Sequence, residues 1–159
     1  MNALAAGISI LLLMVGCSQP PSQPSDPSPV ETGNEQSNGL SVEIEVGDVA
    51  TSQVDEPIEL LLVLSASEPV TLQFSSGQRF DFVVSKDGEE VWRWSGDQFF
   101  TQALGEESLN AGDELRYEAQ WTPMEEGSYD VLGLVTATNP EFEEGSLSAE
   151  QALTVEGRS

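Results

Sequence analysis

The chain of 159 residues has no histidine and a single cysteine, Cys17. Without histidine, the Ser-His-Asp and Cys-His forms of nucleophilic catalysis are excluded, and zinc lacks its commonest nitrogen ligand. A single cysteine cannot form an internal disulfide. The GxGxxG and P-loop patterns that bind phosphates are missing too. Because no pair of carboxylates stands out for acid-base work, the sequence predicts a protein that is not an enzyme and uses no cofactor.

Basic residues are also scarce, with 5 Lys and Arg against 28 Asp and Glu and a net charge of −23. Such a surface repels phosphate backbones, so nucleic acid is excluded as a partner. The same charges repel one another in the compact state, and salt screens that repulsion. The acidic residues are spread through the loops rather than gathered in a tail, which favours a halophilic protein over one with an ordinary acidic surface.

The longest apolar run near the N-terminus, residues 3–15, is too short to span a membrane and has the length of a signal-peptide core. Residues 14–17 (MVGC) resemble a lipobox, although Met stands where Leu is usual and no basic residue precedes the run. We therefore expect a lipoprotein signal peptide at residues 1–16 and a lipid on Cys17. This predicts a protein anchored to the cell membrane by lipid and facing outside the cytoplasm. The alternative is an apolar N-terminal helix with a buried cysteine.

Residues 17–39 are rich in Pro, Ser, Gln, Asn and Gly. A segment of this composition cannot bury enough apolar surface to order itself. It predicts a disordered linker that holds a domain away from the membrane, and the alternative is disordered sequence with no tethering role.

From residue 40 onward the hydrophobic pattern has a period of two, and no segment carries a helical stripe with caps. Residues 40–46 (LSVEIEV) and 114–121 (ELRYEAQW) alternate cleanly, while residues 58–66 (IELLLVLSA) are apolar enough for a central strand. Further strands are expected at residues 70–74, 79–85, 90–95, 128–138 and 147–155. About seven to nine short strands with frequent turns predict an all-β, antiparallel sandwich over residues 40–157.

Residues 74–104 hold most of the aromatic side chains of the chain. The Asp-Gly pair at residues 87–88 predicts a tight hairpin turn between two alternating strands. On the second strand Trp92 and Trp94 share one face, and on the first strand Phe80 and Phe82 face them. We expect Trp92 to belong to the core, and a role of these Trp side chains as a ligand platform is the alternative.

Three of the five basic residues, Arg79, Lys86 and Arg93, lie in this hairpin. They indicate either a less negative contact patch or, as we favour, pairing with neighbouring carboxylates and aromatic faces. Asp81, between two Phe, is expected to bind a loop backbone, as is Gln102.

An ordered series of residues runs through this segment and beyond it: Ser76, Gly77, Asp81, Trp92, Trp94, Ser95, Phe100, Gln102, Trp121 and Tyr129. Over residues 42–138 the series resembles the motif of the BsuPI-type intracellular proteinase inhibitor domain, and its members are taken as structural or binding candidates. The resemblance implies an immunoglobulin-like sandwich that binds and inhibits a proteinase, and it supplies no defined reactive-site residue. The namesake of the family is intracellular, whereas this chain carries a predicted export signal.

An inhibitor needs no catalytic group, only a rigid loop that occupies the cleft of the enzyme, and the ends of a sandwich provide such loops. The alternative function is a surface adhesion or assembly module of the same fold that inhibits nothing, because fold alone does not fix function.

Calcium is a further alternative, because it takes carboxylate oxygens. The acidic groups considered are Asp48, Asp55 and Glu56, and Glu141, Glu143 and Glu144. Their spacing matches no EF-hand loop, so solvated acidic loops are favoured and no metal is predicted.

Overall fold

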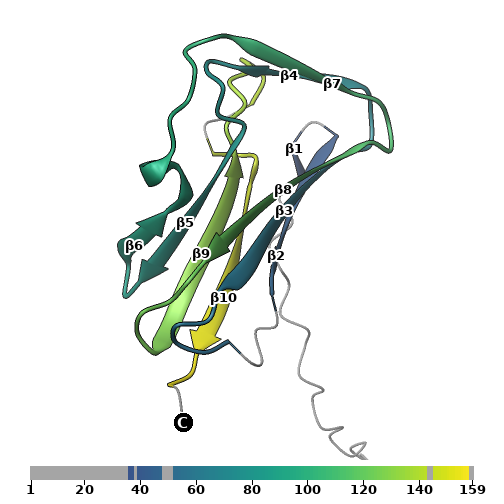
Figure 1. Cartoon of the computed structure of the whole chain (residues 1–159). Helices are drawn as coiled ribbons and strands as arrows, with labels where there is room; N and C mark the ends of the chain where they lie inside the picture. The colour runs from purple at the N-terminus through teal and green to yellow at the C-terminus, as the bar shows by residue number, and fades with distance from the viewer. Residues whose placement is uncertain (1–35, 38, 48–51, 143–144, 158–159) are drawn as a thin grey trace, which may run out of the picture.

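The computed structural model describes residues 36–37, 39–47, 52–142 and 145–157 (Figure 1). The predicted signal peptide, Cys17 and nearly all of the predicted linker lie outside these residues. The strands are β1 (Gln36–Ser37), β2 (Leu40–Val46), β3 (Ile58–Ala66), β4 (Val70–Phe74), β5 (Phe80–Lys86), β6 (Glu89–Arg93), β7 (Gly105–Leu109), β8 (Glu114–Trp121), β9 (Gly127–Val135) and β10 (Ser148–Val155). A 3-10 helix, η1 (Trp94–Asp97), follows β6. In the described part, no helix is both long and apolar enough to cross a membrane.

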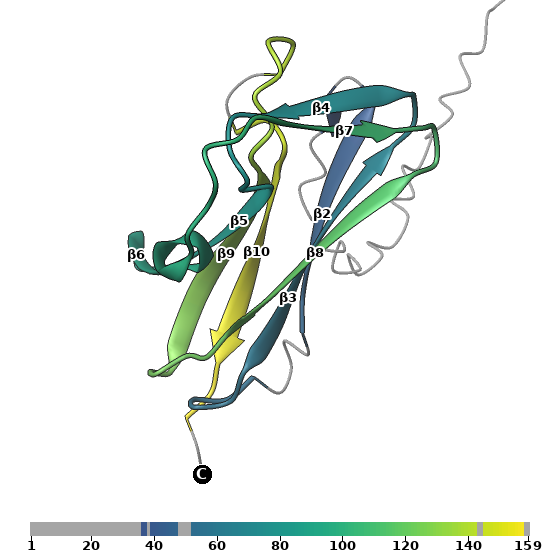
Figure 2. The same cartoon turned by 45° about the horizontal axis from the view of Figure 1, so that its top comes forward.

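The strands form two four-stranded antiparallel sheets, in the orders β1-β2-β3-β8 and β10-β9-β5-β6. Strands β4 and β7 pair separately and cross one end of the sandwich (Figures 1 and 2). The prediction of an all-β, immunoglobulin-like antiparallel sandwich is confirmed, with nine described strands of five residues or more and the two-residue β1. Because β1 falls within residues 17–39, β structure begins before the predicted boundary at residue 40.

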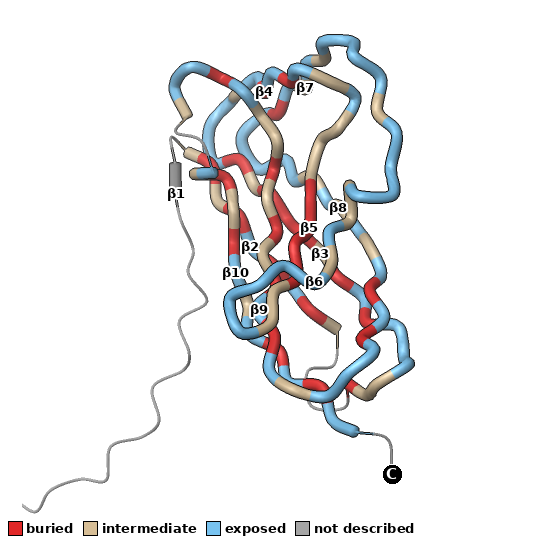
Figure 3. The backbone as a smooth tube through the Cα atoms, turned by 90° about the vertical axis from the view of Figure 1, so that its left-hand side faces the viewer, coloured by how far each residue is buried: buried red, intermediate tan, exposed pale blue. Residues whose placement is uncertain are grey.

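The core lies between the two sheets. Figure 3 shows buried residues along the strands, interspersed with intermediate and exposed ones. In β2, Val42, Ile44 and Val46 are buried, as the alternation predicts. Strand β3 is central, between β2 and β8, which explains its apolar composition. The second sheet contributes Phe82, which is fully buried.

The connection between β8 and β9 is fixed by two aromatic residues. Tyr129 donates its hydroxyl to the carbonyl of Glu125 at 2.8 Å, and its ring meets Trp121 edge-on at 4.9 Å. A Tyr at the start of a strand that binds the backbone a few residues upstream is the tyrosine corner of immunoglobulin-like sandwiches. Trp121 and Tyr129 are both buried, so these motif residues hold the turn between the two sheets.

Two local expectations are corrected by the structure. The second hairpin strand ends at Arg93, so Trp94 lies in η1 and not in the strand. Strand β7 was not expected, because its sequence GEESL has no strand periodicity. It forms because residue-by-residue pairing with β4, from Val70 with Leu109 to Phe74 with Gly105, supplies its hydrogen bonds.

Candidate functional site

The β5–β6 hairpin closes with the predicted tight turn. Asp87 and Gly88 have φ angles of 54° and 81°, as a two-residue turn of type I′ requires. Beyond the turn the pairing register of β5 and β6 shifts by one residue: Ser85 pairs with Glu90, but the preceding Val84 pairs with Trp92. This bulge sets the face on which the end of β6 and the start of η1 present their side chains.

Asp81 ties β5 to the start of η1. Its side chain is almost fully buried on the outer side of β5, under Arg93 and Ser95. The carboxylate accepts hydrogen bonds from the Ser95 backbone N at 3.0 Å, the Ser95 hydroxyl at 2.7 Å and Arg93 Nη1 at 2.8 Å. The Phe82 backbone N adds a fourth bond at 3.0 Å. The expectation that Asp81 binds a loop backbone is thus confirmed.

Arg93 is held by two carboxylates, Glu90 at 2.7 Å and Asp81 at 2.8 Å. The hydrogen bond to Glu90, and to a smaller extent the one to Asp81, raise the pKa of Arg93 above its ordinary value. Arg93 therefore pairs with carboxylates of its own hairpin, as predicted.

The other two basic residues of the segment also have internal partners. Lys86 bonds Glu125 at 2.9 Å, and this hydrogen bond raises the pKa of Lys86 and lowers that of Glu125. The Lys86 Nζ atom also lies 5.3 Å from the centre of the Tyr129 ring. Arg79 lies 4.3 Å from the centre of the Phe74 ring and donates to a loop carbonyl at 2.7 Å. The hairpin therefore offers no free patch of positive charge among these three side chains.

A column of aromatic rings joins η1 to both sheets. Trp94 stacks on Phe80 with ring centres 4.1 Å apart, and Phe80 stacks on Tyr117 of β8 at 4.7 Å. On the outer side, Phe100 packs against Trp94 at 5.7 Å. The expected aromatic pairing with the first strand thus occurs between Trp94 and Phe80, but from η1 rather than across the two strands, where Trp92 pairs with Val84.

Residues 98–104 (QFFTQAL) form the loop that follows η1, here called the 98–104 loop. At its start the Gln98 N–H donates to the Ser95 carbonyl at 3.2 Å, and Gln98 itself has an extended backbone. At its centre the Thr101 carbonyl accepts from the Gly77 N–H at 2.8 Å. A Cβ atom on residue 77 would lie 2.7 Å from Thr101 Oγ1, so the close approach of the two loops requires glycine there.

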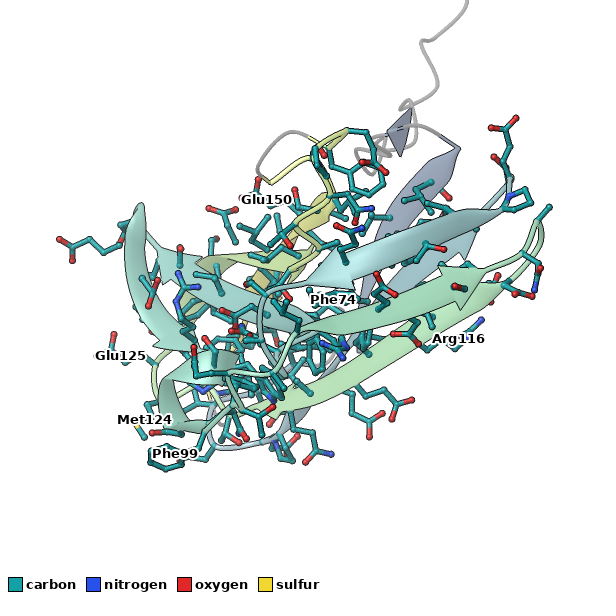
Figure 4. All side chains as sticks on the ribbon, turned by 90° about the horizontal axis from the view of Figure 1, so that it is seen from above. Phe74, Phe99, Arg116, Met124, Glu125 and Glu150 are labelled. Atoms are coloured by element: carbon teal, nitrogen blue, oxygen red, sulfur yellow. The ribbon has the colours of Figure 1, made fainter. Side chains whose placement is uncertain are left out.

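The 98–104 loop exposes apolar side chains. Phe99 is 103% exposed and Leu104 is 84% exposed, whereas Phe100 between them is half-buried. Figure 4 shows the Phe99 ring at the periphery of the molecule, pointing away from the ribbon. None of the residues of the loop is charged, in a chain of net charge −23. An exposed aromatic side chain on a well-held, uncharged loop is suited to contact with another protein.

The structure divides the predicted site residues into two groups. The first surrounds the 98–104 loop, and its members are Ser76, Gly77, Asp81, Trp94, Ser95 and Phe100. The second borders a hollow of about 280 Å³ between β6 and the β8–β9 connection, and its members are Trp92, Trp121 and Tyr129. Gln102 is exposed, and its side chain has no hydrogen-bond partner among the described residues, so its expected backbone contact is not seen.

The sequence did not identify Phe99 and Tyr117 as residues of the site. The signal for Phe99 was the adjacent pair of Phe at residues 99–100, because two neighbouring aromatic side chains seldom both fit into the core. Tyr117 was assigned to the inward face of its strand, but nothing in the sequence indicated that it stacks on Phe80 from the other sheet.

No group of three potential ligands is close enough to hold a metal among the residues that the structure describes. Of the acidic residues considered for calcium, Asp48, Glu143 and Glu144 lie outside that part of the chain.

The family described as BsuPI, intracellular proteinase inhibitor, matches residues 44–140, more than half of the chain. The match includes both strands of the hairpin, η1 and the 98–104 loop. A search of curated proteins gave no match.

Three solved structures with a similar backbone are distant in sequence. The C-terminal domain of wzt has a TM-score of 0.50 at 13% identity, covering 82% of this chain and 81% of that one. The sporulation control protein Spo0M from Bacillus subtilis has a TM-score of 0.48 at 13% identity, covering 76% and 51%. The CARDB domain of the PF1109 protein from Pyrococcus furiosus, in complex with di-metal ions, has a TM-score of 0.42 at 20% identity, covering 73% and 91%. At such identities a likeness concerns the fold alone.

Proposed function

The chain belongs to the BsuPI family of intracellular proteinase inhibitors, and we propose that it inhibits a proteinase by protein-protein binding, without chemistry of its own. The observation that carries the proposal is the family match over residues 44–140, which spans most of the folded domain. The absence of histidine, which excludes the common catalytic triads, is in keeping with a binding protein.

The geometry of the 98–104 loop supports binding in a cleft. Asp81 accepts a hydrogen bond from Ser95 at the start of η1. Within the loop, Phe100 packs against Trp94, and the Thr101 carbonyl accepts from the Gly77 N–H. A loop that is already ordered loses little conformational freedom when it binds, so more of the contact energy remains as affinity. The loop leaves η1, which follows the edge strand β6, and runs to β7 at one end of the sandwich (Figure 2). All its residues except Phe100 are exposed.

The proposal includes a location outside the cytoplasm, with a lipid on Cys17 as the membrane anchor. Its support is in the sequence: the apolar run at residues 3–15, the MVGC tetrapeptide that ends at Cys17, and the Pro- and Ser-rich segment that follows. In this arrangement the partner is a proteinase that the cell meets at its surface.

Titration of serine proteinases with the purified full chain tests the function. Residual activity should fall in a saturable manner at near-stoichiometric ratios, while the chain itself stays intact on a gel. Loss of activity that follows slow digestion of the chain would indicate a competing substrate. If no proteinase is inhibited, the protein is better described as an adhesion or assembly module with the same fold.

A further inference from the structure

The backbone after η1 sends two adjacent aromatic side chains in opposite directions. Phe100 turns inward and packs against Trp94, with ring centres 5.7 Å apart. Phe99, its neighbour, has no such ring contact among the described residues, and the residue is 103% exposed. Exposure of a Phe ring to water is unfavourable, and nothing in the described part of the chain covers it.

The backbone around Phe99 is both held and accessible. Restraints lie on either side, at Gln98, whose N–H binds Ser95, and at Thr101, whose carbonyl binds Gly77. Between them, the backbone groups of Phe99 and Phe100 have no hydrogen-bond partner among the described residues. Free backbone N–H and C=O groups can pair with a strand of another protein, as peptides do when they add to a sheet edge.

We infer that Phe99 is the side chain that enters the specificity pocket of the partner, and that the partner is a proteinase with a large apolar pocket. The inference rests on the proposed function and names the residue and the class of enzyme. It requires a projecting ring on a restrained segment, and Phe99 alone among the exposed large apolar residues of the described part is a Phe.

The absence of charge on the 98–104 loop indicates which kind of proteinase pocket it fits. The residues at positions 98–104 carry no charge, so they cannot satisfy a carboxylate at the base of a pocket that selects Lys or Arg. Two basic residues of this region are engaged elsewhere, since Arg93 bonds Asp81 and Glu90 and Arg79 donates to the Ser76 carbonyl. An unpaired charge buried in the partner would oppose binding, whereas an apolar slot accepts the ring.

The test measures inhibition constants of the full chain against chymotrypsin, which has an apolar slot, and trypsin, which has a carboxylate in its pocket. The variants are Phe99→Ala and Phe99→Lys. Met124→Ala is the matched control, because Met124 is a similarly exposed apolar residue on the β8–β9 connection. Urea unfolding midpoints of all variants should equal that of the wild type, because these side chains are outside the core.

We expect the wild type to inhibit chymotrypsin more strongly than trypsin. Phe99→Ala should weaken inhibition of chymotrypsin about thirtyfold or more, as expected for a central anchor residue, and Met124→Ala should leave it unchanged. Phe99→Lys should transfer inhibition toward trypsin. If the wild type inhibits chymotrypsin and Phe99→Ala inhibits it equally well, the assignment of Phe99 is wrong while the proposed function stands. If the wild type inhibits only trypsin, the assignment of the pocket is wrong. If it inhibits no proteinase tested, the proposed function itself fails, and the role of Phe99 with it.

Discussion

Asp81 binds Ser95 twice, through the backbone N at 3.0 Å and through the hydroxyl at 2.7 Å. One carboxylate of a central hairpin strand thereby fixes the first residues of η1, and through them the start of the 98–104 loop. The side chain of Asp81 is 5% exposed, so these bonds form out of contact with bulk water. Hydrogen bonds to a charged, buried acceptor are among the stronger ones in proteins.

Asp81→Asn should destabilise the domain by about 2 to 4 kcal/mol, because an amide nitrogen then faces donors on Ser95 and Arg93. The urea unfolding midpoint measures this cost. Asp130→Asn is the control, since Asp130 is an exposed Asp on β9, and it should have little effect. Equal midpoints for Asp81→Asn and the wild type would show that the Asp81 hydrogen bonds do not stabilise the fold.

Trp94→Ala and Trp92→Ala should separate stability from binding. Both side chains are half-buried against the core, so each truncation should cost about 2 to 4 kcal/mol. Only Trp94 contacts Phe100, so only Trp94→Ala should also weaken inhibition at temperatures where both variants remain folded. Unfolding midpoints and inhibition constants are needed for each variant. Equal inhibition by the two variants would mean that Trp94 does not support the 98–104 loop.

Tyr117→Phe should stabilise the protein. The buried Tyr117 hydroxyl has no hydrogen-bond partner among the described residues, so its removal should gain about 1 kcal/mol at neutral pH. Burial, with a smaller contribution from Glu107, raises the pKa of Tyr117 to about 12. Because the pKa is higher in the folded than in the unfolded state, the unfolded chain ionises first, and the stability of the wild type falls as the pH rises from about 10 to about 12.

The variant should therefore also lose less stability than the wild type between about pH 10 and pH 12. Urea midpoints at neutral and alkaline pH measure both effects. Tyr129→Phe is the contrasting variant, because its hydroxyl bonds the Glu125 carbonyl and its loss should destabilise the fold. A destabilised Tyr117→Phe would reveal a partner for the Tyr117 hydroxyl.

Salt should stabilise the folded domain, because the net charge of −23 repels itself and ions screen that repulsion. Urea adds no ions, so unfolding midpoints in low salt and in molar KCl measure the effect directly. The midpoint should rise with KCl. A midpoint that does not change would contradict the halophilic interpretation of the composition.

Cys17→Ser should move the protein from the membrane fraction to the soluble fraction, because a cysteine thiol is the acceptor for the proposed lipid. Ser18→Ala, one residue further on, should leave the distribution unchanged. Fractionation of cells that express each variant, followed by immunoblotting, makes the measurement. If Cys17→Ser remains with the membranes, the lipoprotein interpretation is wrong.

Local patterns in the sequence were sufficient for the type and position of most strands. The alternation in β2 and β8, the apolar run of β3 and the Asp-Gly turn at residues 87–88 each arise from neighbours along the chain, where backbone geometry fixes which side chains share a face. The family motif added the β-sandwich arrangement and the list of candidate residues, and Asp81 was correctly expected to bind a loop backbone.

Tertiary structure alone decided how those candidates combine. Strand β7 exists because β4, distant in sequence, pairs with it, and no local preference predicts that pairing. Phe99 and Phe100 are identical in kind, and the difference in their burial comes from Trp94 on one side and the contact of Thr101 with Gly77 on the other. The sequence by itself determined most of the segments that are strands, β7 excepted, because most strands show a local periodicity. Which aromatic side chain faces solvent depends on contacts between distant segments, and those exist only once the two sheets have packed together.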